Sequence, residues 1–200
     1  DDNLDQLNLN IDYIIAYKPL DVKDFSVSKY KRCITYNEMW DEKLTLDEIN
    51  NAKPDIIICH HENDAFRYKN ELYKLIHCNV KIAYIPHSAE KEIFNDMNIK
   101  KDIDILLCGT IGRHYPLRTR LKNLIKLFPK KYNVKMHDHP GYVINNAYTD
   151  IYMKEFAEII NRARICLTCT SKYKYRLAKI VEITMCNSVL ACDMPNQISD

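Results

Sequence analysis

Short apolar segments that are rich in β-branched residues recur along the whole chain. They cover residues 13–17, 55–59, 81–85, 103–108, 164–167 and 188–192. Several of them are almost continuously apolar, whereas a strand with one face in water alternates between apolar and polar residues. We therefore predict strands whose two faces are both covered.

Helical patterns lie between these segments in the second half of the chain. One apolar stripe recurs at helical spacing and consists of Leu117, Leu121, Leu124, Ile125 and Phe128. Another consists of Met153, Phe156, Ile160 and Ala163. Strands that alternate with helices predict parallel sheets and an α/β fold.

A polar segment, residues 90–102, interrupts this alternation before a new strand begins. We therefore expect two Rossmann-like domains, one over residues 1–98 and the other over residues 101–200. A length of about 100 residues is small for a domain of this type. The sequence thus predicts a truncated or compact version of the fold.

The composition excludes several classes of protein. The chain has 200 residues, of which 46% are hydrophobic, as is ordinary for a globular protein with a core. Its formal net charge of +2 provides no overall field that would attract nucleic acid or an anionic membrane. Any anion site must be built locally, and we expect no nucleic-acid partner.

No apolar run approaches the ~20 residues of a transmembrane helix, and the acidic start is unlike a signal peptide. We expect a cytoplasmic protein without a transmembrane segment.

The eight cysteines lie mostly in apolar segments, where a free thiol packs as a small hydrophobic group. Cys166 and Cys169 have the spacing of a redox or zinc pair, but the chain has no second pair of this kind. His137 and His139 are a similarly weak metal signal, because no third ligand stands beside them at helical spacing. We expect reduced, structural thiols and no bound metal, with a metal or redox role as the alternative.

Residues 104–118 read as a strand, a glycine turn and the start of a helix. Two of the chain's three glycines, Gly109 and Gly112, lie in this turn, and backbone amides at a helix start bind phosphate groups. Arg113 and Arg118 stand near the positive end of the helix dipole, where a cation is disfavoured unless an anion is bound. These features favour a phosphate site. The alternative is a tight turn with solvated arginines.

A second cluster of polar residues lies on the helix predicted near residues 177–186. Tyr175, Lys179 and Glu182 fall on one face of this helix. A carboxylate can accept hydrogen bonds from ribose hydroxyls, and a lysine can neutralise a diphosphate. The alternative is an exposed salt bridge between Lys179 and Glu182, worth less than about 1 kcal/mol.

These two segments resemble the carboxy-terminal half of the group 1 glycosyltransferases, which have the GT-B fold, and are most similar to the spore-maturation CgeB-like branch. The similar residues are 104–118 and 179–193. The resemblance implies that Glu182 holds the ribose of a nucleotide-sugar donor. It also implies that the donor's diphosphate faces Gly109, Gly112, Arg113, Arg118 and Lys179.

The chain departs from that family at two positions. Where the family often has glycine, this chain has Asn187, a residue that tolerates a positive φ better than most. Many members also carry a second glutamate eight positions before the first, and here that position is Lys174. The usual contact of that glutamate with a sugar hydroxyl is therefore not carried over.

In the first half of the chain, two predicted strands end in polar clusters. The residues at these ends are His60, His61, Glu62, Asp64 and His87. Ligands of open α/β sheets collect beyond the carboxyl ends of the strands, and a histidine can act as a base or donate a hydrogen bond to a sugar. We therefore expect His60, His61 and His87 to be catalytic. The alternative is that they are loop histidines satisfied by their neighbours.

The sequence thus predicts a metal-independent glycosyltransferase. It would move a sugar from a nucleotide-diphosphate donor to a glycan, protein or small-molecule acceptor, with no cofactor besides the donor. Tyr175 would line the donor site, and the segment that begins at His139 would contact the nucleobase. Two alternatives stay open: a non-catalytic nucleotide-sugar-binding module of the same fold, and a GT-B-fold nucleotide-sugar epimerase.

Overall fold

The computed structural model describes residues 10–17, 28–36, 39, 41–137 and 146–196, and the side chains of 146–150 are not part of that description. The chain divides into two compact units, one that reaches Pro86 and one that runs from His87 to Asn196. Each unit contains a four-stranded parallel sheet with helices packed on it. The predicted α/β class with two Rossmann-like parts is confirmed.

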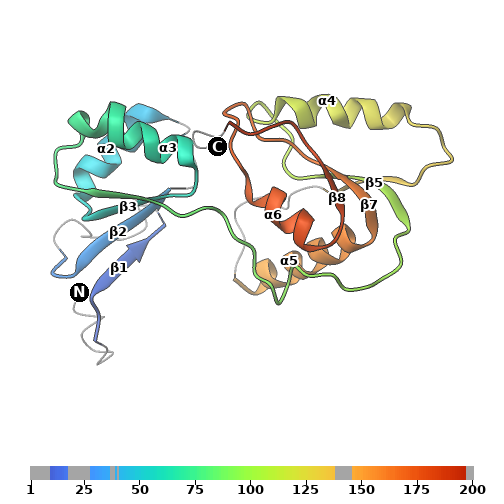
Figure 1. Ribbon diagram of the computed structural model, residues 1–200, viewed down its shortest axis with the longest axis horizontal. Helices are drawn as coiled ribbons and strands as arrows, with labels where there is room; N and C mark the ends of the chain where they lie inside the picture. The colour runs from blue at the N-terminus through green and yellow to red at the C-terminus, as the bar shows by residue number, and fades with distance from the viewer. Residues whose placement is uncertain (1–9, 18–27, 37–38, 40, 138–145, 197–200) are drawn as a thin grey trace. The chain divides into compact units, whose positions relative to one another are not determined.

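The strands of the first unit follow one another across the sheet in chain order. They are β1 (Tyr13–Ala16), β2 (Lys31–Tyr36), β3 (Ile56–Cys59) and β4 (Lys81–Tyr84). The helices α2 (Glu42–Ala52) and α3 (Glu62–Arg67) lie on one face of this sheet (Figure 1). When each new strand is added on the same side of the previous one and every crossover is right-handed, successive helices lie on the same face of the sheet. After α3 the chain continues as a π-helical turn (Tyr68–Leu72) and a 3-10 turn (Tyr73–Leu75).

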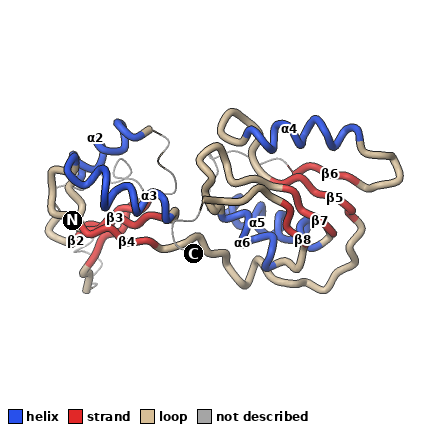
Figure 2. The backbone as a smooth tube through the Cα atoms, turned by 45° about the horizontal axis from the view of Figure 1, so that its top comes forward, coloured by secondary structure: helices blue, strands red, loops and turns tan. Residues whose placement is uncertain are grey.

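The strands of the second unit are β5 (Ile103–Cys108), β6 (Val134–His137), β7 (Ala163–Leu167) and β8 (Val189–Ala191), and their order in the sheet is β6-β5-β7-β8. The helix α4 (Pro116–Leu124) lies on one face of the sheet, whereas α5 (Asn146–Asn161) and α6 (Ala178–Met185) lie on the other (Figure 2). The strand order reverses between β5 and β7. This reversal is the point at which open α/β sheets bind ligands.

Buried apolar residues form one core in each unit. The largest fully buried side chains include Ile34, Ile57 and Tyr68 in the first unit, and Leu106 and Phe156 in the second. Each core contains both strand and helix residues. The second sheet has helices on both faces, as the nearly continuous apolar segments predicted, whereas the described helices of the first unit cover one face of its sheet.

The strands predicted in the six apolar segments all form, with ends that differ by at most one residue, but the sequence did not predict β2, α2 or α3. The strand β2 begins with Lys31 and Arg32, so its apolar part is short. One predicted stripe is also wrong in part. The helix α4 ends at Leu124 and continues as a 3-10 turn (Ile125–Leu127), and this leaves Leu124 and Phe128 52% and 40% exposed.

Residues 87–98, which the sequence grouped with the first half, pack on the second unit. Phe94 is 1% exposed in the second core. The Asn161 side chain holds this segment, since its Oδ1 accepts a hydrogen bond from the Met97 amide at 2.9 Å and its Nδ2 donates to the Asn95 carbonyl at 2.9 Å. At the nearby end of α6, Asn187 has a φ of +53°, which confirms the expectation that asparagine replaces glycine at a left-handed position.

Candidate functional site

Two loops meet where the strand order of the second unit reverses. The loop after β5 begins at Gly109, and the loop after β7 begins at Thr168. Both follow the carboxyl ends of neighbouring parallel strands, because β5 pairs with β7. Ligands of such sheets bind in this crevice. The predicted phosphate loop therefore stands at the place where the topology favours a ligand.

Two features of position 109 require a glycine: the backbone conformation and the close approach of a neighbouring side chain. Its φ is +97°, a conformation that other residues rarely adopt. A Cβ atom at this position would lie 2.7 Å from Nη1 and 2.9 Å from Cζ of Arg118. The glycine thus lets the loop backbone rest directly against a guanidinium group.

Arg118 joins the two loops. It is the third residue of α4, after Pro116, and is only 2% exposed. Its Nε donates to Thr168 Oγ1 at 3.2 Å, its Nη1 to the Thr110 carbonyl at 3.1 Å, and its Nη2 to the Cys169 carbonyl at 3.4 Å. Its guanidinium carbon also lies 4.3 Å from the centre of the Tyr115 ring. The side chain of Arg118, which the sequence predicted to face a phosphate group, is therefore turned inward, beneath the glycine loop.

The positive charge of Arg118 is buried among neutral hydrogen-bond partners. In the part of the chain that the structure describes, no carboxylate forms an ion pair with it. Burial of a charge is costly unless an opposite charge or many hydrogen bonds offset it. An anion bound against these loops would supply the missing opposite charge.

The rim of the loops is also positive. Arg113 is exposed, and its Nε donates to His114 Nε2 at 3.1 Å. Desolvation, together with the positive charges of Lys172 and Arg113, lowers the pKa of His114. The imidazole is therefore mainly neutral at pH 7, because protonation would add a third cation to this rim.

A substitution tests the role of Gly109. We expect Gly109→Ala to destabilise the chain by about 1–3 kcal/mol, because alanine is strained at this φ and its Cβ displaces Arg118. Thermal unfolding followed by circular dichroism measures this change. In an Arg118→Ala background the steric part of the cost should disappear. An equal cost in both backgrounds would show that the guanidinium is not what excludes a side chain here.

Lys179 and Glu182 form the salt bridge that the alternative interpretation proposed, but the bridge is not exposed. Lys179 Nζ lies 3.0 Å from Glu182 Oε2, and the two side chains are 16% and 8% exposed. The Lys179 ammonium also lies 4.1 Å from the centre of the Phe156 ring. Within the described residues, Glu182 Oε1 accepts no hydrogen bond, so one oxygen of a nearly buried carboxylate still has the capacity to accept one.

The ring beside Lys179, Phe156, is part of a stack of aromatic rings. His137, at the end of β6, stacks on Phe156 with ring centres 5.0 Å apart. The predicted site residue Tyr175 precedes α6, which begins at Ala178, so it does not share a helix face with Lys179 and Glu182 as the sequence predicted. Its side chain is 4% exposed and stacks on Tyr173, with ring centres 5.5 Å apart. The sequence had pointed to His137 only as a weak metal signal with His139. His139 and the predicted nucleobase segment 139–142 lie outside the described residues.

Lys174, the second departure from the family pattern, is held by Asp193 beyond the end of β8. Its Nζ lies 2.6 Å from Asp193 Oδ2. Thr170 donates to the same carboxylate from its amide at 2.8 Å and from its hydroxyl at 2.7 Å. Burial raises the pKa of Asp193, but the hydrogen bonds from Lys174 and Thr170 outweigh it, so the pKa lies below its ordinary value. This cluster fixes the loop after β7 to β8.

The histidines of the first half belong to different units. His60 and His61 lie in the first unit, whereas His87 is the first residue of the second. His60 Nδ1 lies 2.9 Å from the Ile85 carbonyl oxygen. His61 is 3% exposed and precedes α3 as its N-cap residue. The first two are thus built into the carboxyl end of β3, and the catalytic role of the three stays a prediction.

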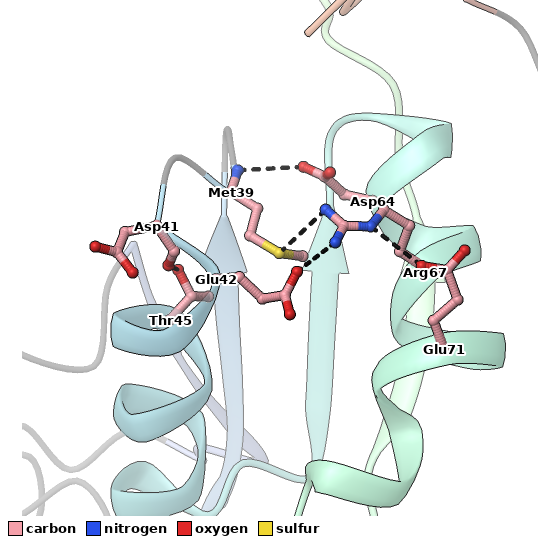
Figure 3. A network of polar contacts seen from close by, with 7 residues as sticks. All are labelled: Met39, Asp41, Glu42, Thr45, Asp64, Arg67 and Glu71. Carbon is pink, nitrogen blue, oxygen red and sulfur yellow. Dashed lines mark hydrogen bonds and ion pairs between the residues drawn. The ribbon is translucent and has the colours of Figure 1, made fainter.

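A polar network in the first unit joins α3 to Met39 and to the start of α2 (Figure 3). Asp64 Oδ2 accepts a hydrogen bond from the Met39 amide at 3.3 Å. Arg67 pairs with Glu42 and, at 3.4 Å, with Glu71. The network ties α3 to the start of α2, and Asp64, a polar residue of the predicted cluster, is engaged in it.

The cysteines are free thiols in the structure, and most of them are buried. Cys166 lies within β7, and Cys169 lies in the loop after it. A hydrogen bond with Cys166 and burial both raise the pKa of Cys108. Such a thiol stays protonated and packs as an apolar group. The described residues contain no group of three or more His, Cys, Asp or Glu that could hold a metal ion.

No protein-family model matches the chain, and no curated protein matches it in sequence. A solved structure does match in fold: a chain in the crystal structure of the GtfA/B complex, a glycosyltransferase, has a TM-score of 0.55 and 14% sequence identity. The match covers 96% of this chain and 44% of that chain, so this chain spans less than half of the length of its neighbour. At this identity the likeness shows the fold, which is of the GT-B type. None of the described helices could span a bilayer.

Proposed function

We propose that the second unit binds a nucleotide-diphosphate sugar and that the chain transfers the sugar to an acceptor. The observation that carries this proposal is the buried guanidinium of Arg118 at the reversal of the strand order. A diphosphate would provide the negative charge that the described neighbours of Arg118 lack. The GT-B fold is compatible with this reaction but does not by itself establish it.

The proposed roles follow from what each side chain can reach. Arg118 lies behind the loop of Gly109 and acts on the diphosphate from beneath it, while the exposed Arg113 approaches from solvent. Preorganised cations of this kind stabilise the charge that develops on a leaving diphosphate. Glu182 accepts a hydrogen bond from the ribose through Oε1, and Lys179 holds the carboxylate in place through Oε2. The CgeB-like branch is our more specific assignment, and it rests on residues 104–118 and 179–193.

One observation favours a second candidate function, a non-catalytic binding module of the same fold. Many group 1 glycosyltransferases, the family that this chain resembles, have a glutamate where this chain has Lys174. Here Lys174 forms an ion pair with Asp193. A module of this kind would bind the nucleotide sugar without turnover. An epimerase would bind it as well, but its product would be an isomeric nucleotide sugar.

A screen by thermal shift tests the binding proposal. Uridine and guanosine diphosphates and their sugars are added to the full chain, and a ligand at about 100 times its Kd should add roughly 2.7 kcal/mol of stability. A shift followed by release of free nucleoside diphosphate supports transfer or hydrolysis. A shift without product supports the binding module, whereas no shift with any of them contradicts the proposed donor site.

We also expect the activity to be independent of divalent metal. Arg113, Arg118 and Lys179 supply the positive charge that a bound cation would otherwise provide at the diphosphate. Product formation should therefore be unchanged when EDTA is added to the assay. Loss of product with EDTA and its recovery with Mn²⁺ would contradict this expectation.

A further inference from the structure

One stretch of the second unit has a strong local excess of positive charge. The formal net charge of the whole chain is only +2, but the segment 105–137 contains no Asp or Glu. Its basic residues are Arg113, Arg118, Arg120, Lys122, Lys126, Lys130, Lys131 and Lys135. All of them except Arg118 are exposed or half-buried. The near-neutral total therefore conceals a basic region.

Large apolar side chains are exposed within the same stretch. Leu124, Leu127, Phe128 and Tyr132 are 52%, 78%, 40% and 44% exposed. The Phe128 and Tyr132 rings contact each other with their centres 6.5 Å apart. Single exposed apolar residues are ordinary, but several neighbouring ones indicate an interaction surface.

The geometry of α4 separates this surface from the core. Leu117, Leu121 and Ile125 are half-buried and recur at helical spacing, whereas Arg120 and Leu124 lie on the exposed side. The helix is alone on its face of the sheet, so its outer side is uncovered in the described part of the unit (Figure 2). We call the exposed residues the basic-apolar surface, which consists of Arg120, Leu124, Lys126, Leu127, Phe128, Lys130, Lys131 and Tyr132.

Carboxylates at the nearest strand end do not neutralise this surface. Asp104 accepts a hydrogen bond from the Asn133 amide at 2.9 Å, and Asn133 directly follows Tyr132. Asp104 also pairs with Arg164 at 3.4 Å, and its neighbour Asp102 pairs with Arg162 at 2.7 Å. These two negative charges are each matched by an arginine from the strand region of β7.

We propose that the basic-apolar surface docks on an anionic lipid bilayer. Lysines attract acidic headgroups, and leucine and phenylalanine side chains enter the boundary between headgroups and acyl chains. The charge complementarity and the two exposed leucines, of which Leu127 is the most exposed apolar residue of the surface, favour this partner. A nucleic-acid surface uses rings that stack on bases, but here the two most exposed apolar side chains, Leu127 and Leu124, have none, and the Phe128 and Tyr132 rings contact each other. This inference is independent of the proposed donor site.

Vesicle flotation tests the docking surface with the full chain. We expect binding to vesicles of phosphatidylcholine with about 30% phosphatidylserine and little binding to phosphatidylcholine alone. The triple variant Lys126→Gln, Lys130→Gln, Lys131→Gln should bind about a hundredfold more weakly, at roughly fivefold per lysine. The matched control replaces the exposed lysines Lys91, Lys100 and Lys154 with glutamine, and it should bind as the wild type does.

A second variant separates lipid from other anionic partners. Leu127→Ser leaves the charge unchanged and replaces the most exposed apolar side chain of the surface, so the fold should be retained, as circular dichroism can verify. It should weaken vesicle binding about tenfold, because a leucine side chain no longer enters the bilayer. The proposal is overturned by absence of binding to the anionic vesicles, by equal losses in the two triple variants, or by tight oligonucleotide binding that Leu127→Ser leaves intact.

Discussion

Replacing Arg118 with alanine should weaken the binding of a nucleoside diphosphate by at least about tenfold and leave the binding of the nucleoside nearly unchanged. A hydrogen bond to a charged group contributes ~1.5–3 kcal/mol, and each ~1.4 kcal/mol changes affinity tenfold. The removed charge is buried beneath the loop that is proposed to hold the phosphates. Isothermal titration calorimetry with both ligands measures the difference.

Two control variants accompany this measurement. Arg120→Ala removes an exposed arginine of the same helix, which makes no hydrogen bond to either loop in the described structure, and it should change diphosphate affinity little. Arg118→Lys keeps the charge but loses the planar fork that reaches both loops, and it should bind the diphosphate with intermediate affinity. If Arg118→Ala weakens nucleoside and diphosphate equally, the guanidinium acts on the loops alone and does not bind phosphate.

The second large effect is expected at Glu182. Glu182→Gln keeps the shape of the side chain but removes its charge, so both the ribose contact and the Lys179 ion pair become weaker. We expect the affinity for a ribonucleoside diphosphate to fall by about tenfold or more. Glu155→Gln, an exposed position on α5, serves as the matched control and should bind normally.

A comparison of sugars shows whether Glu182 contacts the ribose. A 2′,3′-dideoxynucleoside diphosphate lacks the hydroxyls, so it should bind the wild type and Glu182→Gln almost equally. The wild type should discriminate between the two nucleotides, and the variant should not. If the variant discriminates as strongly as the wild type, the buried ion pair with Lys179 is the whole role of Glu182.

The sequence predicted strands best where the apolar residues are continuous. Segment 103–108 contains three consecutive buried residues, as a strand covered on both faces does, whereas in segment 55–59 buried and half-buried residues alternate. Continuous runs of β-branched and other apolar residues bounded by polar ones favour strands in both cases. The strand β2 was missed because its first residues, Lys31 and Arg32, are polar and lie at the exposed end of the sheet. Asp55 accepts hydrogen bonds from the amide and the side chain of Arg32 there, which the local pattern does not reveal.

Contacts between distant residues explain the other differences. Segment 87–98 looks like a linker, because most of its residues are polar. Its attachment depends on Asn161, a residue more than sixty positions away in the chain. Similarly, Lys174 departs from the family pattern in sequence, but its role depends on Asp193, which only the folding of β8 brings near.

The sequence by itself determined the α/β class, the glycine turn after β5, and the cluster of cations beside it, because periodicity, glycine and charge are local properties. Only the tertiary structure decided which way each side chain points. It turned Arg118 inward to join two loops, buried the Lys179–Glu182 pair, and left Leu127 exposed beside lysines. Burial and pairing depend on strand order and on helix packing, and these bring together residues whose separation in the chain has no regular spacing.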